Sequence, residues 1–367
     1  MIYKNFQNIN LSALGMGTMR LPTVSGDDTK IDEVQTAAMV QQAFAQGINY
    51  VDTAWFYHGG NSEIVMGKVL QNYPRDSFYL ASKFPGVNPA WGCESVKQVF
   101  ERQLEKCQVE YFDFYLYHNV TDRNVDMFLD PENGIHEYLM EQKRLGRIRH
   151  LGFSTHGSLA TIRRFLEAHG DDMEFCQIQL NWLDWKLQNA QAKVELLNRH
   201  NIPIWVMEPV RGGRLVNLPE DDIATLEALR PGVKTPEWAF RFLQSIDGVT
   251  MVLSGMSNEQ QMQENLLTFS EHKPVNETEF AALMAMADRM IAKNAVPCTA
   301  CNYCVDHCPM NIVIPNVIKM YNESVSGTLL HPDAPGPKEC ISCGKCRLHC
   351  PQGINIPGVM KAYADKL

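Results

Sequence analysis

Four residues with acid–base side chains follow apolar, strand-like runs of the sequence. Asp52 ends one run with Tyr57 just beyond it, Lys83 ends the next, and His118 ends a third. A carbonyl group that accepts a hydride develops negative charge on its oxygen, which a nearby acid must protonate. Tyrosine is a weak acid, but an adjacent ammonium lowers its pKa, and a carboxylate fixes that ammonium in place. Since a histidine can hydrogen-bond to the same oxygen, the four residues predict a site that reduces a carbonyl group.

A repeating pattern of strand and helix supplies these positions. The predicted strands cover residues 13–16, 48–51, 78–82, 112–117, 148–153, 175–179, 204–207 and 249–253. Amphipathic stretches between them are long enough for crossover helices. Eight such units predict an α/β chain folded as a (β/α)8 TIM barrel, whose active site lies at the C-terminal ends of the strands. A doubly wound open sheet is the alternative, but no strand leads into the G-x-G-x-x-G turn that such a sheet needs for a dinucleotide.

The residues before the second barrel strand carry signals of their own. Two short strands are predicted over residues 2–6 and 9–14, and the second leads into Gly15-Met16-Gly17, where glycine permits close approach of the backbone to a ligand. A helix is predicted over residues 32–46, with Asp32 as its cap and Gly47 as its stop.

Composition limits the classes of partner. The chain has 367 residues, 45% of them hydrophobic, a formal net charge of −9 and a sequence pI of about 5.7. Without a block of Lys and Arg, a nucleic-acid or anionic-membrane partner is not expected. No signal-peptide pattern and no long apolar run is present, which predicts a soluble cytoplasmic protein with a small-molecule ligand.

Eight of the eleven cysteines lie after Pro297, in two runs of identical spacing. The runs are Cys298-x-x-Cys301-x-x-Cys304-x-x-x-Cys308-Pro309 and Cys340-x-x-Cys343-x-x-Cys346-x-x-x-Cys350-Pro351. This is the bacterial [4Fe-4S] spacing, in which the fourth cysteine of each run binds the cluster of the other run. Zinc is the alternative, but zinc sites commonly use paired C-x-x-C units. The predicted ligand sets are Cys298, Cys301, Cys304 and Cys350 for one cluster, and Cys340, Cys343, Cys346 and Cys308 for the other.

The repeat extends beyond the cysteines. Ile314-Pro315-x-Val317 recurs as Ile356-Pro357-x-Val359, so each run leads into a helix with proline in its first turn. Residues 297–367 resemble the α-helical type of two-cluster ferredoxin. We therefore expect a barrel with its trailing helix over residues 1–295 and a small, mainly α-helical iron–sulfur domain over residues 296–367.

Residues 11–269 resemble the aldo-keto reductases. The resemblance rests on the Gly-x-Gly-Thr opening, on Asp52-Thr53-Ala54 with Tyr57, and on Lys83 and His118. It implies a TIM barrel that binds extended NADP or NAD without a Rossmann fold. It also implies carbonyl reduction by a catalytic tetrad with Tyr57 as the general acid.

The same resemblance implies a set of cofactor contacts. Gly152-Phe153-Ser154-Thr155 and Gln177 resemble the segments that hold the nicotinamide carboxamide, and Ser254-Gly255 with Glu264-Asn265 resembles the adenine and phosphate segment. The implied contacts are Gly17, Thr18, Met19, Ser154, Thr155, Gln177, Met207, Pro209, Arg211, Gly213, Arg214, Gly255, Gln261, Glu264 and Asn265.

Several of these positions depart from the family pattern. Thr155 replaces the usual asparagine, and Met207 stands where many members stack a tyrosine on the nicotinamide, although a thioether can pack there too. Gln261 and Gly255 replace an arginine and a lysine of members that prefer NADPH. Arg211 or Arg214 could supply the missing cation or contact the pyrophosphate, so the choice between NADH and NADPH stays open.

Two functions are compatible with these patterns. The first is an NAD(P)-dependent reductase or dehydrogenase of carbonyl or alcohol substrates that carries two [4Fe-4S] clusters. The alternative is a nucleotide-sensing or electron-transfer module that docks to a redox partner protein, and the intact tetrad favours the enzyme. Trp55, Trp91 and Trp185 are candidates for the substrate pocket, with packing between loops as the equal alternative. Substrate identity depends on loop shape and is not predicted.

Overall fold

The computed structural model describes residues 1–88, 92–292, 296–325 and 335–367. They form two compact units, and each is described by itself. The first comprises Met1–Leu180, Asn189–Pro209 and Phe240–Val275, and the second comprises Asn181–Gln188, Val210–Ala239 and Asn276–Leu367. All strands belong to the first unit, whereas all eight clustered cysteines belong to the second. Within the described residues no helix is long and apolar enough to cross a membrane.

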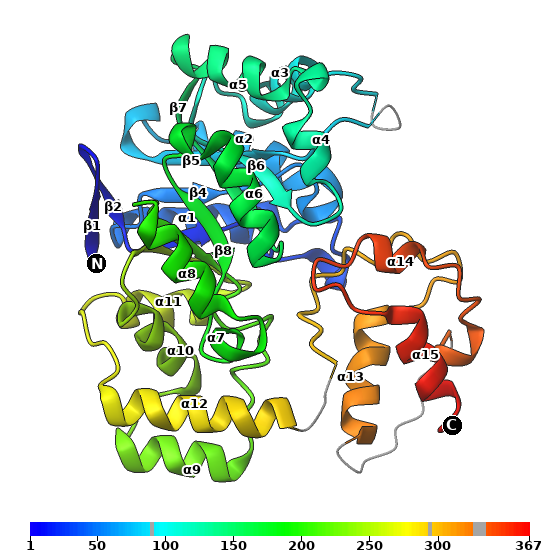
Figure 1. Cartoon of the computed structure of the whole chain (residues 1–367). Coiled ribbons are helices and arrows are strands. Elements are labelled where there is room, and N and C mark those ends of the chain that lie inside the picture. The colour runs from blue at the N-terminus through cyan, green and yellow to red at the C-terminus, as the bar shows by residue number, and fades with distance from the viewer. Residues whose placement is uncertain (89–91, 293–295, 326–334) are drawn as a thin grey trace. The chain divides into compact units, whose positions relative to one another are not determined.

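Eight parallel strands close into a barrel, as the alternation of strands and helices predicts (Figure 1). Neighbouring strands follow the order β10-β3-β4-β5-β6-β7-β8-β9. Their bounds are β3 Leu14–Gly17, β4 Tyr50–Asp52, β5 Tyr79–Phe84, β6 Phe112–Val120, β7 Ile148–Thr155, β8 Cys176–Gln179, β9 Ile204–Met207 and β10 Val249–Gly255. The TIM-barrel prediction is confirmed.

The start of β4 differs from the prediction. The strand begins at Tyr50 rather than at residue 48, because the two preceding residues are used elsewhere. The amide of Ile48 donates to Ala43 O at the end of the preceding helix, and the Asn49 side chain accepts from the amide of Ser12 at 2.9 Å. The chain therefore enters the barrel two residues later than its apolar pattern indicates.

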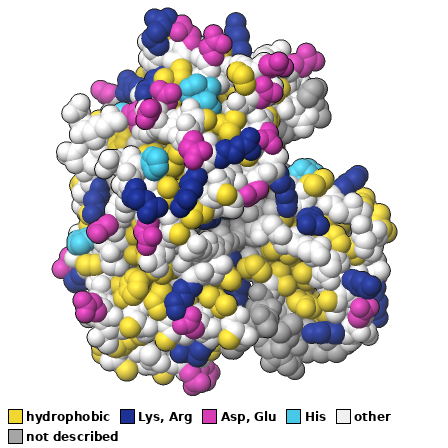
Figure 2. All heavy atoms as spheres, in the orientation of Figure 1, with side chains coloured by type: hydrophobic (Ala, Val, Ile, Leu, Met, Phe, Trp, Pro, Cys, Tyr) yellow, Lys and Arg dark blue, Asp and Glu magenta, His cyan; other side chains and the backbone are white. Residues whose placement is uncertain are grey.

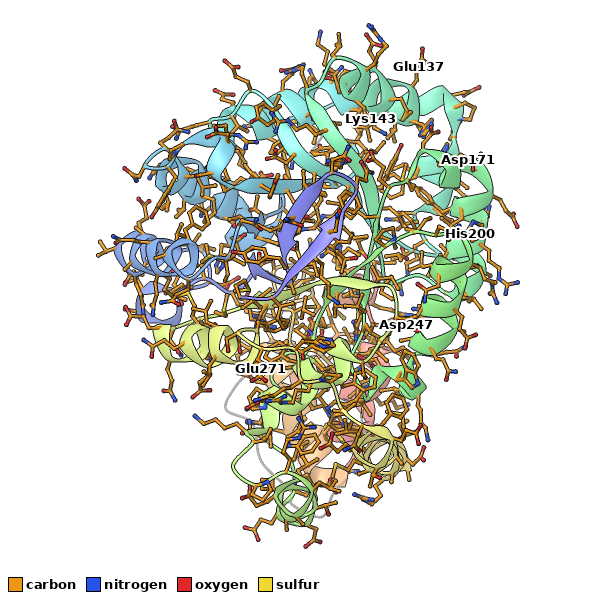
Figure 3. All side chains as sticks on the ribbon, turned by 90° about the vertical axis from the view of Figure 1, so that its left-hand side faces the viewer. Glu137, Lys143, Asp171, His200, Asp247 and Glu271 are labelled. Atoms are coloured by element: carbon orange, nitrogen blue, oxygen red, sulfur yellow. The ribbon has the colours of Figure 1, made fainter. Side chains whose placement is uncertain are left out.

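An antiparallel hairpin, β1 Tyr3–Phe6 and β2 Ile9–Ser12, lies across one end of the barrel (Figure 3). Phe6 reaches the barrel core, with its ring 5.1 Å from that of Trp205 and 5.6 Å from that of Phe114. Acidic side chains labelled in Figure 3, such as Glu137 and Asp171, lie at the periphery instead. The hairpin thus buries apolar surface at the N-terminal end of the strands and leaves the opposite end for the chemistry.

Helices of the first unit cover the barrel. They are α1 Glu33–Ala45, α2 Asn61–Leu70, α3 Val96–Cys107, α4 Val125–Leu129, α5 Ile135–Arg144, α6 Leu159–His169, α8 Ala190–Arg199 and α11 Glu259–Thr268, while α10 Thr235–Gln244 spans the division between the units. Predicted helix ends are confirmed at α1: the Asp32 side chain accepts from the amide of Gln35 at 2.9 Å, and Gly47 has a φ of 93°.

The second unit holds the remaining helices: α7 Asp184–Leu187, α9 Glu220–Leu229, α12 Glu277–Ala292, α13 Ile314–Val325, α14 Lys345–Leu348 and α15 Ile356–Ala364. The two helices that begin with Ile-Pro are α13 and α15, and they share a small apolar core that includes Ile318, Met360 and Tyr363. The sequence repeat is therefore a structural repeat. Whether a domain boundary falls at residue 295 stays a prediction.

Candidate active site and cysteine-lined cavities

Neighbouring strands bring the four acid–base residues together. Asp52 ends β4 and pairs in register with Ala81 of β5, the strand that carries Lys83 two residues further on. His118 lies in β6, and Tyr57 opens the short 3-10 turn Tyr57–Gly60 after β4. Since parallel strands end at the same rim of a barrel, residues far apart in the sequence meet there.

A buried ammonium joins three of these groups. Lys83 Nζ lies 2.6 Å from Asp52 Oδ1 and 3.2 Å from the Tyr57 hydroxyl oxygen, and it donates to the carbonyl of Thr53 at 2.8 Å. An ammonium can only donate, so the phenol oxygen accepts from it. The phenolic proton of Tyr57 is therefore left to point at another group.

Burial dominates the acidity of this cluster. It raises the pKa of Tyr57 well above its usual value, and the carboxylates of Asp52 and Glu208 add to that rise. The sequence pattern predicts that the neighbouring ammonium lowers this pKa. The structure gives the opposite direction, because desolvation and two carboxylates outweigh one cation. Burial also lowers the pKa of Lys83, against the opposing effect of Asp52. Tyr57 is consequently a protonated phenol at neutral pH.

His118 stands beside the phenol as a neutral imidazole. Its pKa lies well below the usual value because of burial, the charge of Lys83 and the charge of His156. Its ring meets that of Tyr57 edge to face at 6.2 Å between centroids, and Phe56 lies 6.4 Å away with 39% of its surface exposed. Phe56 was missed by the sequence reasoning, although its place directly before Tyr57 was a signal that it would reach the rim.

His58 holds the turn that carries Tyr57. Its Nε2 accepts from the amide of Leu21 at 3.1 Å, so Nδ1 carries the proton and donates to the carbonyl of Asp28 at 2.7 Å. The residue is buried and has a φ of 54°, a conformation that L residues adopt only when their surroundings enforce it. This positioning residue was also missed by the sequence reasoning.

Several predicted cofactor contacts of the first unit lie at the C-terminal ends of β3 and β7. Gly17 packs against the backbone of β10, where a Cβ would lie 3.3 Å from Ser254 O. Thr18 donates to the carbonyl of Asp52 at 2.8 Å, so its hydroxyl is engaged inside the protein. The Ser154 hydroxyl accepts from the amide of Asn119 at 2.8 Å, whereas Thr155 donates to the carbonyl of Val120 at 2.7 Å.

Gln177 differs from these residues because part of its side chain is unsatisfied. It is buried, and its Oε1 has no hydrogen-bond partner among the described residues. A buried acceptor without a partner costs free energy, which a donor on a bound ligand would recover. The nicotinamide carboxamide has such a donor, so this residue fits the group that the resemblance implies.

The predicted adenine segment lies beside a cation that the sequence reasoning missed. A Cβ on Gly255 would lie 3.1 Å from Cβ of Arg20, so this arginine runs alongside Gly255. Nearby, Gln261 accepts from the amide of Ser257 at 2.8 Å, Glu264 accepts from Gln260, and Asn265 donates to the Ser254 hydroxyl at 3.0 Å. Met19, Met207 and Pro209 are the remaining predicted contacts in the first unit, and each is at least partly buried.

The other predicted contacts belong to the second unit. Arg211 is fully buried, and its Nε donates to Asp184 Oδ1 at 2.9 Å. Gly213 and Arg214 are partly buried, and Trp185 packs edge to face on Phe280 at 6.2 Å.

Two of the three tryptophan predictions concern the first unit. Trp55 is nearly buried, with the Lys106 ammonium 4.6 Å from its ring centroid. Trp91 lies outside the described residues. A substrate role for these tryptophans stays a prediction.

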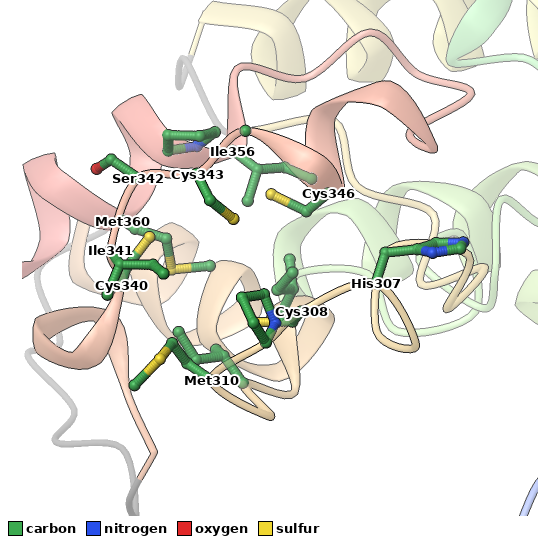
Figure 4. A pocket seen from close by; sticks show the side chains of 15 residues that line it. His307, Cys308, Met310, Cys340, Ile341, Ser342, Cys343, Cys346, Ile356 and Met360 are labelled. Carbon is green, nitrogen blue, oxygen red and sulfur yellow. The ribbon is translucent and has the colours of Figure 1, made fainter.

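The eight clustered cysteines line two separate cavities of the second unit. Cys298, Cys301, Cys304 and Cys350 line one, together with Thr299 and Gln352. Cys308, Cys340, Cys343 and Cys346 line the other, where Cys343 and Cys346 point into the shared space (Figure 4). Each cavity thus takes three cysteines from one run and the fourth from the other, which is the grouping expected for [4Fe-4S] ligands.

Cysteine acidity reflects the same grouping. Burial raises the pKa of Cys346 to about 11, and the charges of Cys340, Cys343 and Cys308 add to the rise. Burial raises the pKa of Cys304 as well, with contributions from Cys301, Cys298 and Cys350. Four thiols that oppose one another's ionisation fit a cationic metal core, which would stabilise all four as thiolates.

Comparison with known proteins extends these observations. The model of the aldo/keto reductase family matches residues 13–288, and that of the 4Fe-4S dicluster domain matches residues 297–354. A probable aldo-keto reductase from soybean is 29% identical over 56% of this chain, and an NADH-specific methylglyoxal reductase from Escherichia coli is 26% identical over 57%. The chain spans 58% and 66% of the length of these two relatives.

A solved structure also matches this chain. The holo form of an aldo-keto reductase from Bacillus halodurans matches with a TM-score of 0.64 and 25% identity, over 78% of this chain and 96% of that one. The first family match covers well over half of the chain and includes the whole barrel. The chain therefore belongs to the aldo/keto reductase family and carries a C-terminal 4Fe-4S dicluster domain.

Proposed function

We propose that this protein reduces carbonyl compounds with hydride from NADH or NADPH, and that Tyr57 is the general acid. The observation that carries the proposal is the contact of Lys83 Nζ with both Asp52 and the Tyr57 hydroxyl. A protonated phenol whose oxygen is already bonded to an ammonium has its proton available for a substrate oxygen.

Each residue has a separate part in the reaction. The nicotinamide, when bound, supplies the hydride to the carbonyl carbon. Tyr57 gives its proton to the carbonyl oxygen, and the Lys83 ammonium stabilises the phenolate that remains. Asp52 holds Lys83 in place and keeps it charged, since burial alone favours the neutral amine. Neutral His118 orients the same carbonyl oxygen by a hydrogen bond.

Within this proposal Gln177 holds the nicotinamide carboxamide, and Arg211 and Arg214 contact the phosphates of the cofactor. The unsatisfied Oε1 of Gln177 supports binding of the carboxamide. With Gln261 and Gly255 in place of two cations, we expect weaker discrimination in favour of NADPH than in relatives that keep them. Arg20, which runs beside Gly255, is the described cation nearest to that position of the adenine segment.

The cysteine-rich domain would bind two [4Fe-4S] clusters, one in each four-cysteine cavity. The apolar core shared by α13 and α15 of the cysteine-rich domain is small, so the metals would contribute much of the stability of this domain. Hydride transfer moves two electrons together, whereas each cluster accepts one. We therefore propose that the clusters are not needed for the chemical step.

Steady-state turnover under anaerobic conditions tests the enzymatic proposal. Purified protein is mixed with NADH or NADPH and a panel of aldehydes, ketones and sugars, beginning with methylglyoxal because a relative is named for it. Sustained nucleotide oxidation that depends on a carbonyl compound is the expected result. At most one slow turnover per chain with every compound would contradict the proposal and favour a nucleotide sensor.

A further inference from the structure

The loop after β9 rests on the cysteine loop that begins at Cys298. Both segments belong to the second unit. Gly212 has a φ of 61°, and a Cβ there would lie 1.9 Å from the carbonyl oxygen of Thr299. The two main chains are thus in direct contact, and only glycine allows so close an approach.

A second contact joins the same cavity to Asn181–Gln188, the segment that follows β8 and also belongs to this unit. Gln188 follows α7, and its Nε2 donates to Oε1 of Gln352. Thr299 and Gln352 both line the cavity of Cys298, Cys301, Cys304 and Cys350, and neither lines the other cavity. The Cys298 cavity is therefore the one that supports the two loops.

The supported loop presents an arginine with unused donors. Arg211 is fully buried, and Asp184 accepts from its Nε alone; Nη1 and Nη2 have no partner among the described residues. Buried guanidinium nitrogens without acceptors favour an anionic ligand. Arg214 belongs to the same turn, where its amide donates to the carbonyl of Arg211 at 3.1 Å.

We propose that the cluster held by Cys298, Cys301, Cys304 and Cys350 positions the Arg211–Arg214 loop for the phosphates of the nicotinamide cofactor. Loss of this cluster would then weaken nucleotide binding, whereas loss of the other cluster would have a smaller effect. The inference rests on the proposed function, since phosphate contacts by Arg211 and Arg214 are part of it.

The physical reason is the support given by Thr299. Four thiolates around a metal core fix the backbone on both sides of Cys298, which includes the carbonyl under Gly212. Without the core this backbone is free to move, and the arginine loop loses the surface on which it rests. A nucleotide would then have to order the loop as it binds, which reduces its apparent affinity.

Nucleotide affinity in cysteine variants tests the proposal without any carbonyl substrate. Anaerobically purified wild type, Cys350→Ala and Cys308→Ala are titrated with NADH and NADPH, and the dissociation constant is read from nucleotide fluorescence. Iron content and low-temperature spectra establish which site each variant has lost. We expect Cys350→Ala to raise the dissociation constant by about tenfold or more and Cys308→Ala by about threefold at most.

Glycine variants test the contact itself with both clusters retained. Gly212→Ala places a methyl group against Thr299, and Gly232→Ala is the matched control, because its φ of 77° imposes the same backbone strain with no atom within 4 Å. Weaker nucleotide binding in Gly212→Ala with full iron content is expected, and Gly232→Ala should bind as the wild type does.

The outcomes separate this inference from the proposed function. If wild-type protein with both clusters bound neither nucleotide, the proposed function would fail. If it bound nucleotide but the two cysteine variants weakened binding equally, or neither did, only the positioning role would fail. An unchanged dissociation constant in both Arg211→Met and Arg214→Met would also overturn it.

Discussion

Removing either partner of the buried Asp52–Lys83 pair should destabilise the barrel far more than removing both. The two charged atoms lie 2.6 Å apart, and both side chains are almost wholly buried. Lys83→Met leaves a buried carboxylate that must either stay charged or take up a proton. An aspartate ordinarily titrates near pH 4, so protonation at pH 7 costs about 4 kcal/mol. Asp52→Asn leaves a buried amine, and releasing its proton at pH 7 costs about 5 kcal/mol by the same reasoning.

The double variant removes both of these costs. Exchanging a whole buried pair for neutral groups is often close to neutral in stability, whereas breaking one costs about 3–5 kcal/mol. We expect Asp52→Asn with Lys83→Met to lie within about 2 kcal/mol of the wild type. Urea unfolding followed by tryptophan fluorescence is the assay, since all six tryptophans precede residue 239. A double variant as unstable as the sum of the single variants would refute the reasoning.

The pH dependence of the single variants should have opposite signs. Burial raises the folded-state pKa of Asp52, and the charge of Lys83 opposes that rise. Lys83→Met removes this opposing charge. Folded Lys83→Met then binds more protons than its unfolded chain above about pH 4, so its stability falls as pH rises. Burial lowers the pKa of Lys83, so Asp52→Asn becomes more stable as pH rises towards the ordinary pKa of lysine. Identical pH profiles for the two variants would contradict this assignment.

Three further predictions concern the metals and the cofactor. Cys350→Ala should damage the cluster of the first cysteine run, and Cys308→Ala should damage that of the second. Iron analysis and electron paramagnetic resonance of the two variants will distinguish these losses. If each variant instead lost the cluster of its own run, the exchange of the fourth cysteine between the runs would be excluded. Protein freed of both clusters should keep its kcat for carbonyl reduction at saturating nucleotide and show only a raised KM for nucleotide, provided the barrel stays folded by circular dichroism. Arg20→Gln should lower kcat/KM for NADPH about tenfold and leave that for NADH nearly unchanged, because a 2′-phosphate needs a cation beside Gly255; an equal loss with both cofactors would exclude Arg20 as the discriminating residue.

Periodicity predicted the parts of the fold that repeat. Apolar runs located all eight barrel strands, and Asp52 and Lys83 could be placed together because parallel strands share one rim. The spacing of the two cysteine runs likewise indicated the four-cysteine groups. Such patterns can be recognised in the sequence because each recurs along the chain.

Contacts that occur only once could not be predicted from the sequence. Nothing local indicated that Arg20 runs beside Gly255 or that Gly212 rests on Thr299, since each depends on how two distant loops meet. The direction of the Tyr57 pKa shift was also misjudged, because it depends on burial and on Glu208, which no spacing rule connects to that phenol.

The most direct test of the central claim is hydride transfer by wild type and Tyr57→Phe under anaerobic conditions. Each protein is given [4-²H]NADH or [4-²H]NADPH with an aldehyde that the wild type reduces, and deuterium in the alcohol is measured by mass spectrometry during a single turnover. We expect deuterium on the carbinol carbon with the wild type. With Tyr57→Phe we expect a rate lower by about 10²–10⁴-fold, while the nucleotide dissociation constant stays within about twofold. Equal rates in the two proteins would contradict the assignment of Tyr57 as the acid.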